Sequence, residues 1–208
     1  MTSTQAIVRR ASTIGSFVDP ETDTDIKLRK EHPARAKGKL IMATTDPKPP
    51  QNASDLYKNL FATATEFIRS QDQDITQPTR MNLNRVRVIR APSHQHLFGH
   101  NYLVSTKPPF QGVHSLEDFM AHLNAMLPSL DTWDTYITDI VVDETRKMCI
   151  VRASYFMKPV GVTDAVENDL VWWLWMDEGG EKVEKAMEFV DGLATGRIRE
   201  LIMGVEAR

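Results

Sequence analysis

Apolar residues recur every three or four positions in the first part of the chain after residue 51, a spacing that places them on one face of a helix. Ser54 or Asn52 can cap the first of these helices, because a short polar side chain accepts a hydrogen bond from a backbone N–H of the first turn. Pro92 ends the second, since the residue before a proline is pushed out of the helical region. Three helices are expected here, over residues 52–68, 81–90 and 115–128.

After residue 130 the hydrophobic period changes to two, which is typical of β-strands. The sequence Asp177-Glu178-Gly179-Gly180 is the clearest hairpin turn, because glycine adopts the positive φ angles that tight turns require. Within the first strand, Ile137 and Val141 are expected on one face and Ile140 on the other. Four strands are expected, over residues 135–142, 148–157, 170–176 and 183–190, followed by a short helix over 198–203.

Three helices followed by a four-stranded antiparallel sheet make an α+β domain, in which the helices cover one face of the sheet. The alternation places Trp172 and Trp173 on opposite faces of their strand. Bulky side chains therefore occupy both faces, and the face without helices also needs cover. A homodimer built through the sheet is the expected arrangement.

Residues 1–51 differ from the rest, with several prolines, few large apolar residues and a basic run over 27–39. Such a stretch cannot bury enough apolar surface to offset its ordering entropy, so an extended or partly disordered N-terminal extension is expected. Residues 7–12 carry arginine and serine, and no acid occurs before Asp19, which is a weak match to a transit peptide. The globular domain is expected over residues 52–208.

Composition excludes several classes of protein. A formal net charge of -3 gives no general attraction to nucleic acid or to an anionic membrane, and no apolar stretch reaches the roughly 18 residues of a membrane helix. Cys149 is the single cysteine, which excludes an internal disulfide and indicates a reducing, cytoplasmic location. The sequence contains neither a glycine-rich phosphate loop nor a nucleophile elbow, so nucleotide binding and serine-hydrolase chemistry are disfavoured.

Three passages share their order and spacing with a known family: Arg-Ala-Pro-Ser-His-Gln-His at 90–96, Asp-Glu-Thr-Arg-Lys at 143–147, and the strands that contain Glu-Asn-Asp at 167–169 and Glu-Phe-Val-Asp at 188–191. They make the chain similar to the SnoaL-like branch of the nuclear transport factor 2-like superfamily, and to its short fungal members of polyketide and terpenoid biosynthesis. The resemblance implies a cone-shaped α+β barrel, with three N-terminal helices packed on a curved four-stranded sheet around an apolar cavity. Ser93-His94 replaces the family's Asp-Cys, so an acid cannot be assumed there.

The resemblance also implies a function. It indicates a cofactor-independent enzyme, an isomerase, cyclase or dehydratase, that acts on a hydrophobic polyketide- or terpenoid-derived intermediate by proton transfer or by a pericyclic route. A non-catalytic ligand-binding or protein-interaction module of the same fold is the alternative. Members of the family generally work without metal, so neither a metal nor another cofactor is expected.

Four residues are candidates for catalysis. His96 matches the family position, and the ordinary pKa of histidine lies near neutrality, as a general acid or base requires. Asp169, Glu188 and Asp191 lie on or at the ends of the last two strands, and a carboxyl group inside an apolar cone has a raised pKa. Two plainer interpretations stay open: Glu188 on the wet side of an edge strand, and Asp191 as a cap for the element that follows.

Other polar and aromatic side chains are candidates for substrate binding. The tyrosine hydroxyl groups can donate a hydrogen bond to a substrate carbonyl, and a tryptophan can shape the cavity, although at least two tryptophans are expected in the core or the interface. A His-x-His pair could also supply two ligands of a metal site that a carboxylate completes. The candidates are His94, His100, Tyr57, Tyr155, Trp172 and Trp173.

Overall fold

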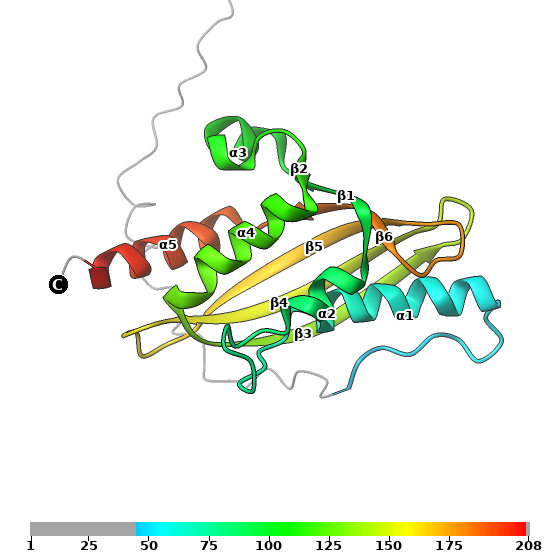
Figure 1. Ribbon diagram of the computed structural model, residues 1–208, viewed down its shortest axis with the longest axis horizontal. Coiled ribbons are helices and arrows are strands. Elements are labelled where there is room, and N and C mark those ends of the chain that lie inside the picture. The colour runs from blue at the N-terminus through cyan, green and yellow to red at the C-terminus, as the bar shows by residue number, and fades with distance from the viewer. Residues whose placement is uncertain (1–44, 207–208) are drawn as a thin grey trace, which may run out of the picture. The chain divides into compact units, whose positions relative to one another are not determined.

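A six-stranded sheet organises the part of the chain that the computed structural model describes, residues 45–206 (Figure 1). Four long strands form an antiparallel meander: β3 (Leu130–Asp143), β4 (Met148–Pro159), β5 (Val166–Met176) and β6 (Val183–Phe189). The strand order is β2-β1-β6-β5-β4-β3, since β1 (Arg90–Phe98) pairs in parallel with β6, and β2 (His114–Ser115) pairs with β1. Most of the N-terminal extension expected over 1–51, with its transit-peptide-like segment, lies outside the described residues.

Helices cover one face of this sheet. In Figure 1, α1 and α2 lie over one end of the strands, and α4 and α5 lie over the other. The short helix α3 belongs to the connection between β1 and β2. No helix within residues 45–206 is both long and apolar enough to cross a membrane. The helices are α1 (Asp55–Arg69), α2 (Leu83–Val88), α3 (Asn101–Thr106), α4 (Leu116–Met126) and α5 (Gly192–Glu206).

The expected α+β class is confirmed, but the expected count of three N-terminal helices and four strands is wrong. The second helix already ends at Val88, so Pro92 does not end it as expected, and the chain continues as β1, in which Pro92 lies. This strand has mixed polar composition and no hydrophobic alternation, and Pro92 lies within a bulge in its pairing with β6. Helix α5 is also longer than the range 198–203, because Asp191 caps it seven residues before its first buried side chain, Ile198.

Two serines start the helices that the pattern predicts. The Ser54 hydroxyl accepts a hydrogen bond from the Tyr57 N–H at 2.9 Å and begins α1. Ser115 begins α4 in a capping box, in which its hydroxyl accepts from the Asp118 N–H and the Asp118 carboxylate accepts from the Ser115 N–H. Local sequence is enough to place both of these helix starts.

A bulge changes the faces expected in β3. The pairing of β3 with β4 shifts register between Ile137 and Asp139, so that Ile137 and Ile140 both point to the helices. Val141 is 53% exposed, and its expected position beside Ile137 is therefore wrong. A strict period of two fails wherever one strand gains a residue relative to its neighbour.

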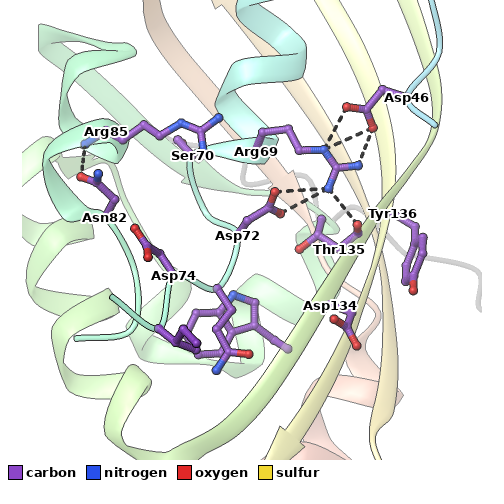
Figure 2. Close-up of a pocket in the computed structure, with 13 residues that line it drawn as sticks. Asp46, Arg69, Ser70, Asp72, Asp74, Asn82, Arg85, Asp134, Thr135 and Tyr136 are labelled. Carbon is purple, nitrogen blue, oxygen red and sulfur yellow. Dashed lines mark hydrogen bonds and ion pairs between the residues drawn. The ribbon is translucent and has the colours of Figure 1, made fainter. Parts of the chain in front are cut away.

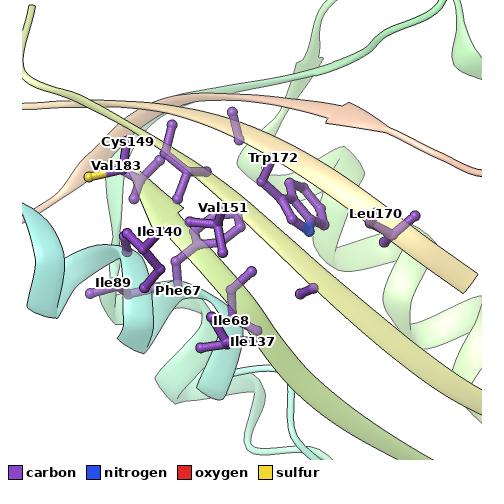
Figure 3. Close-up of a cluster of buried hydrophobic side chains, with 14 of the residues drawn as sticks. Phe67, Ile68, Ile89, Ile137, Ile140, Cys149, Val151, Leu170, Trp172 and Val183 are labelled. Atoms are coloured by element: carbon purple, nitrogen blue, oxygen red, sulfur yellow. The ribbon is translucent and has the colours of Figure 1, made fainter. Parts of the chain in front are cut away.

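The main hydrophobic core lies between α1 and the meander (Figure 3). Trp172 is 1% exposed, and the Phe67 ring meets it edge-on with 5.2 Å between ring centroids. Burying each of these side chains contributes roughly 1.5–3 kcal/mol to folding. Cys149 is buried in the same cluster, and burial raises the pKa of its thiol to about 12, so the thiol is unreactive.

The opposite face of the sheet also carries aromatic side chains. Trp173 is 38% exposed and lies against Phe189 and Trp175, with centroid separations of 5.4 Å and 6.1 Å. Trp172 and Trp173 therefore do point to opposite faces, as the alternation predicts. A homodimer through this outer face stays a prediction.

The turn between β5 and β6 docks on helix α1. The Thr63 hydroxyl donates a hydrogen bond to the Gly180 carbonyl at 2.7 Å, and the Asn59 amide donates to the Gly179 carbonyl at 3.1 Å. Gly180 has a φ of +71°, and a Cβ there would lie 3.1 Å from the Leu60 side chain and 3.2 Å from its backbone nitrogen. This turn requires glycine at position 180 because both the backbone conformation and the space exclude a side chain.

Gly180→Ala is expected to lower the free energy of unfolding by about 1–3 kcal/mol, the combined effect of an unfavourable φ and overpacking. Gly179→Ala is the matched control, because the nearest atom to its Cβ would be the flexible Glu181 side chain at 3.7 Å. Urea unfolding of both variants, followed by tryptophan fluorescence, measures the difference. Equal destabilisation of the two variants would contradict the assignment.

Candidate functional site

An apolar cavity of about 390 Å³ lies between the inner face of the sheet and the helices α4 and α5. Its volume falls in the range of small-molecule sites, roughly 300–1,000 Å³. The segment after α3 closes a further side. Its walls are mainly aromatic and aliphatic side chains, among them Phe98, Phe119, Leu123, Leu170, Trp172 and Ile198.

Glu188 is the one carboxyl group among the described residues that line this cavity. It lies on β6 directly opposite Trp172 of β5, and only 14% of its side chain is exposed. Burial raises the pKa of Glu188 to about 7, although the positive charge of Arg90 and the nearby His122 oppose the rise. A carboxyl group with this pKa can both accept and release a proton near neutrality.

His96 lies directly behind Glu188. Its Nε2 is 3.3 Å from Glu188 Oε2, and its side chain is 1% exposed. The imidazole stacks on the Phe119 ring at 4.5 Å between centroids. Burial, together with the positive charge of Arg90, holds the pKa of His96 well below its usual value, so the ring is neutral at physiological pH. A neutral imidazole beside a protonated carboxyl group can exchange a proton with it.

Arg90 supplies the positive charge in this cluster. Its guanidinium lies between the Phe67 and Phe119 rings, 4.1 Å and 4.7 Å from their centroids, and donates a hydrogen bond to the Val86 carbonyl at 2.7 Å. Burial lowers the pKa of Arg90 to about 9, which still leaves it charged at neutral pH. Its Nε and Nη2 have no protein partner among the described residues.

Two more polar groups line the cavity opposite the helices. Tyr155 of β4 is buried, and its hydroxyl has no hydrogen-bond partner among the residues described. Burial, and secondly the Glu188 carboxylate, raise the pKa of the Tyr155 hydroxyl, so it remains a hydrogen-bond donor. Asn168 of β5 is 7% exposed and its Oδ1 is likewise unpartnered within residues 45–204. Both groups can bind a polar atom of a ligand.

Asp169 does not join this site. It lies on the outer face of the sheet with Trp173, where Arg152 donates hydrogen bonds to its carboxylate. The alternation along β5 places Asp169 on the same face as Trp173, and this face does not border the cavity. Asn168 lies on the face of Trp172 and lines the cavity, although it is not among the candidates expected from the sequence.

Asp191 is a helix cap. Its Oδ1 accepts hydrogen bonds from the backbone N–H groups of Leu193 and Ala194 at 2.9 Å and 3.1 Å. The carboxylate is therefore occupied by the first turn of α5, and Asp191 is exposed and does not line the cavity. The structure therefore supports the interpretation of Asp191 as a cap for the helix that follows.

The remaining candidates lie outside the cavity, except Trp172. His94 is buried, and its Nδ1–H donates to the Val183 carbonyl at 2.9 Å. His100 is exposed at the start of α3, and Tyr57 stacks on Phe61 within α1. The three histidines at 94, 96 and 100 do not converge, and residues 45–204 contain no group of three His, Cys, Asp or Glu side chains with metal-site geometry.

A second, larger hollow of about 800 Å³ lies between α1 and β3 and is polar (Figure 2). Arg69 donates hydrogen bonds there to the Asp46 and Asp72 carboxylates and, at 2.9 Å, to the Thr135 carbonyl. Burial raises the pKa of Asp72, but Arg69 pairs with its carboxylate. Because the apolar cavity holds Glu188, whose pKa lies near 7, together with the unpartnered Tyr155 and Asn168 side chains on mainly apolar walls, we assign the candidate site to that cavity.

The chain has the fold of the solved structures that superpose on it, among them a SnoaL-like protein and an ntf2-like protein. PrhC from Penicillium brasilianum NBRC 6234 matches with a TM-score of 0.58 and 18% identity, over 73% of this chain and 93% of that protein. BvnE pinacolase from Penicillium brevicompactum matches with a TM-score of 0.57 and 12% identity, over 74% and 94%.

A proposed SnoaL-like polyketide cyclase from Jannaschia Sp. CCS1 matches with a TM-score of 0.52 and 15% identity, over 70% of this chain and 94% of that protein. No protein-family model and no curated protein matches the chain. These likenesses confirm the expected fold class, and because one fold hosts many reactions, the function depends on the residues of the cavity.

The pKa of Glu188 predicts a pH dependence of stability. Its folded value of about 7 exceeds the ordinary 4.5, so protonation favours the folded state. The resulting stability is fully present below about pH 4.5 and is lost as the pH rises through 7, by up to about 3 kcal/mol. Glu188→Gln removes this loss, and the variant should gain stability relative to the wild type as the pH rises from about 5 to about 8.

Urea unfolding at several pH values measures this difference. Glu184→Gln is the matched control, because Glu184 is an exposed residue of the same strand. A stability difference between Glu188→Gln and the wild type that stays constant with pH would contradict the raised pKa.

Proposed function

We propose that this protein is a cofactor-independent enzyme of secondary metabolism. It catalyses isomerisation, cyclisation or dehydration of a polyketide- or terpenoid-derived intermediate inside the apolar cavity. The observation that carries the proposal is the position of Glu188, which faces the cavity with a pKa of about 7 and has the neutral His96 behind it. Together with the Tyr155 hydroxyl, a hydrogen-bond donor, it gives the enclosed space a proton-transfer group and a polar partner for a substrate, which a purely apolar binding module does not need.

The geometry assigns a role to each group. The Glu188 carboxylate accepts a proton from a C–H or O–H group of the substrate, and the resulting carboxylic acid returns the proton at another position. His96 accepts this proton only transiently through its Nε2, which is 3.3 Å from Glu188 Oε2, because burial holds the pKa of His96 well below its usual value. The Tyr155 hydroxyl donates a hydrogen bond to the oxygen on which negative charge develops, and the apolar walls strengthen that interaction because they exclude water.

Proteins of the same fold support this class of chemistry. BvnE is a pinacolase, and the Jannaschia protein is a proposed polyketide cyclase. A pinacolase and a proposed cyclase are thus both found on this fold. The mainly apolar walls of the cavity here suit a hydrophobic, multi-ring substrate.

Glu188→Gln is expected to lower kcat/KM at least 100-fold, because positioned acid–base groups contribute about 10²–10⁴ in rate. For the wild type, kcat/KM should rise with pH through about 7, as the carboxylate form of Glu188 becomes populated, and the variant should lose this inflection. Tyr155→Phe should lower kcat about 10–100-fold while KM changes less, because its hydrogen bond forms with developing charge.

The substrate for these assays comes from metabolite profiling of a host that lacks the gene, since the compound that accumulates is the natural intermediate. Glu184→Gln on the same strand and Asp169→Asn on the outer face serve as controls with unchanged turnover. Wild-type rates in Glu188→Gln would rule out proton transfer and would favour a pericyclic reaction controlled by cavity shape alone. Absence of any accumulated compound and of any turnover would favour the non-catalytic binding module.

A further inference from the structure

Two cationic side chains lie at the open side of the cavity. Lys107 follows α3, and Arg199 lies on α5, so they reach the cavity from elements far apart in the sequence. Both line the cavity and both are exposed, which places them where the cavity meets solvent. Neither side chain has a hydrogen-bond or ion-pair partner among the residues described.

Other basic residues of the described part are mostly engaged. On the same helix, Arg197 pairs with Glu200 at 3.3 Å, and on the outer face Arg152 pairs with Asp169. Lys107 and Arg199 differ from these because they line the cavity and pair with no acidic side chain among the residues described, Glu188 included. Two exposed cations that line one cavity from different elements favour the binding of an anion there.

The cavity is therefore polarised from its opening to its interior. The opening carries Lys107 and Arg199, the walls are apolar, and the one lining carboxyl group, Glu188, is mostly buried. An anionic group placed inside would lose its hydration and approach the Glu188 carboxylate, both of which are unfavourable. An anionic group at the opening would instead remain partly hydrated and meet two cations.

We propose that the substrate is an amphipathic carboxylate, whose acid group Lys107 and Arg199 bind at the opening while its apolar body extends to Glu188. The inference rests on the proposed function, since it names the substrate class of the same cavity. It also fixes the direction of binding: the atoms that exchange a proton with Glu188 belong to the end of the substrate remote from its carboxylate. Lys107 and Arg199 then determine specificity and orientation, and they take no part in the chemical step.

A matched pair of ligands tests this substrate class without knowledge of the natural substrate. Naphthylacetate and naphthylacetamide share an apolar ring system that fits the cavity, and they differ in the charge of one terminal group. Isothermal titration calorimetry of the full chain should show about tenfold tighter binding of the carboxylate at low salt, as expected for two partly exposed ion pairs. High salt should reduce this preference because it screens exposed charges.

Variants of Lys107 and Arg199 test whether these two side chains cause the preference for the carboxylate ligand. Lys107→Met combined with Arg199→Met should abolish the preference for the carboxylate and leave the affinity for the amide within about twofold. Arg197→Met combined with Lys58→Met is the matched control, because it removes the same charges from exposed positions that do not line the cavity. The control should keep the full preference.

The outcomes separate this inference from the proposed function. Equal binding of acid and amide by the wild type, or an equal loss of preference in the control, would overturn the carboxylate assignment while leaving the cavity as a ligand site. Binding of neither compound would overturn both, because they share that cavity. A carboxylate preference that disappears only in the Lys107 and Arg199 variant supports the inference, even if Glu188→Gln retains wild-type turnover and the acid–base proposal fails.

Discussion

The parallel pairing of β1 with β6 is the constraint on which the site depends. It sets His96 beside Ala186 and Phe98 beside Glu188, and the Gly99 N–H donates to the Glu188 carbonyl at 2.7 Å. At Gly99 a Cβ would lie 2.2 Å from the Phe189 ring, so only glycine allows the strand to end this close to β6. This pairing joins the first half of the domain to the last strand and brings the β1 histidines behind the cavity wall.

Burial then gives each ionisable group of the cluster its character. Because water is excluded, His96 is neutral and Glu188 titrates near neutrality. Burial also lowers the pKa of Arg90, but only to about 9, so Arg90 stays charged between two aromatic rings. Placing such groups in an interior is unfavourable, and the large apolar core around Trp172 offsets the cost. The shifted pKa values and the unpartnered polar atoms both follow from the burial of polar groups around the cavity. This burial lowers the stability of the fold at the candidate site.

Local patterns were sufficient for much of the fold. Ser54 and Ser115 begin helices where their side chains can cap them, and Gly180 turns the last hairpin, because each of these effects depends on residues only a few positions apart. Strand β1 could not be predicted from such local patterns. Its hydrogen bonds are made with a strand about 90 residues further along the chain, and its polar side chains have no alternation, since several of them point into the protein.

The sequence by itself therefore determined the α+β class, most helices and the four long strands, and it selected His96, Glu188 and Tyr155 as candidates. Only the tertiary structure decided which face of β5 borders the cavity, and with it that Asn168 lines the site while Asp169 pairs with Arg152 outside. A period of two divides residues between two faces but does not say which face is covered. That choice is made by the packing of α4 and α5, through contacts between residues distant in sequence.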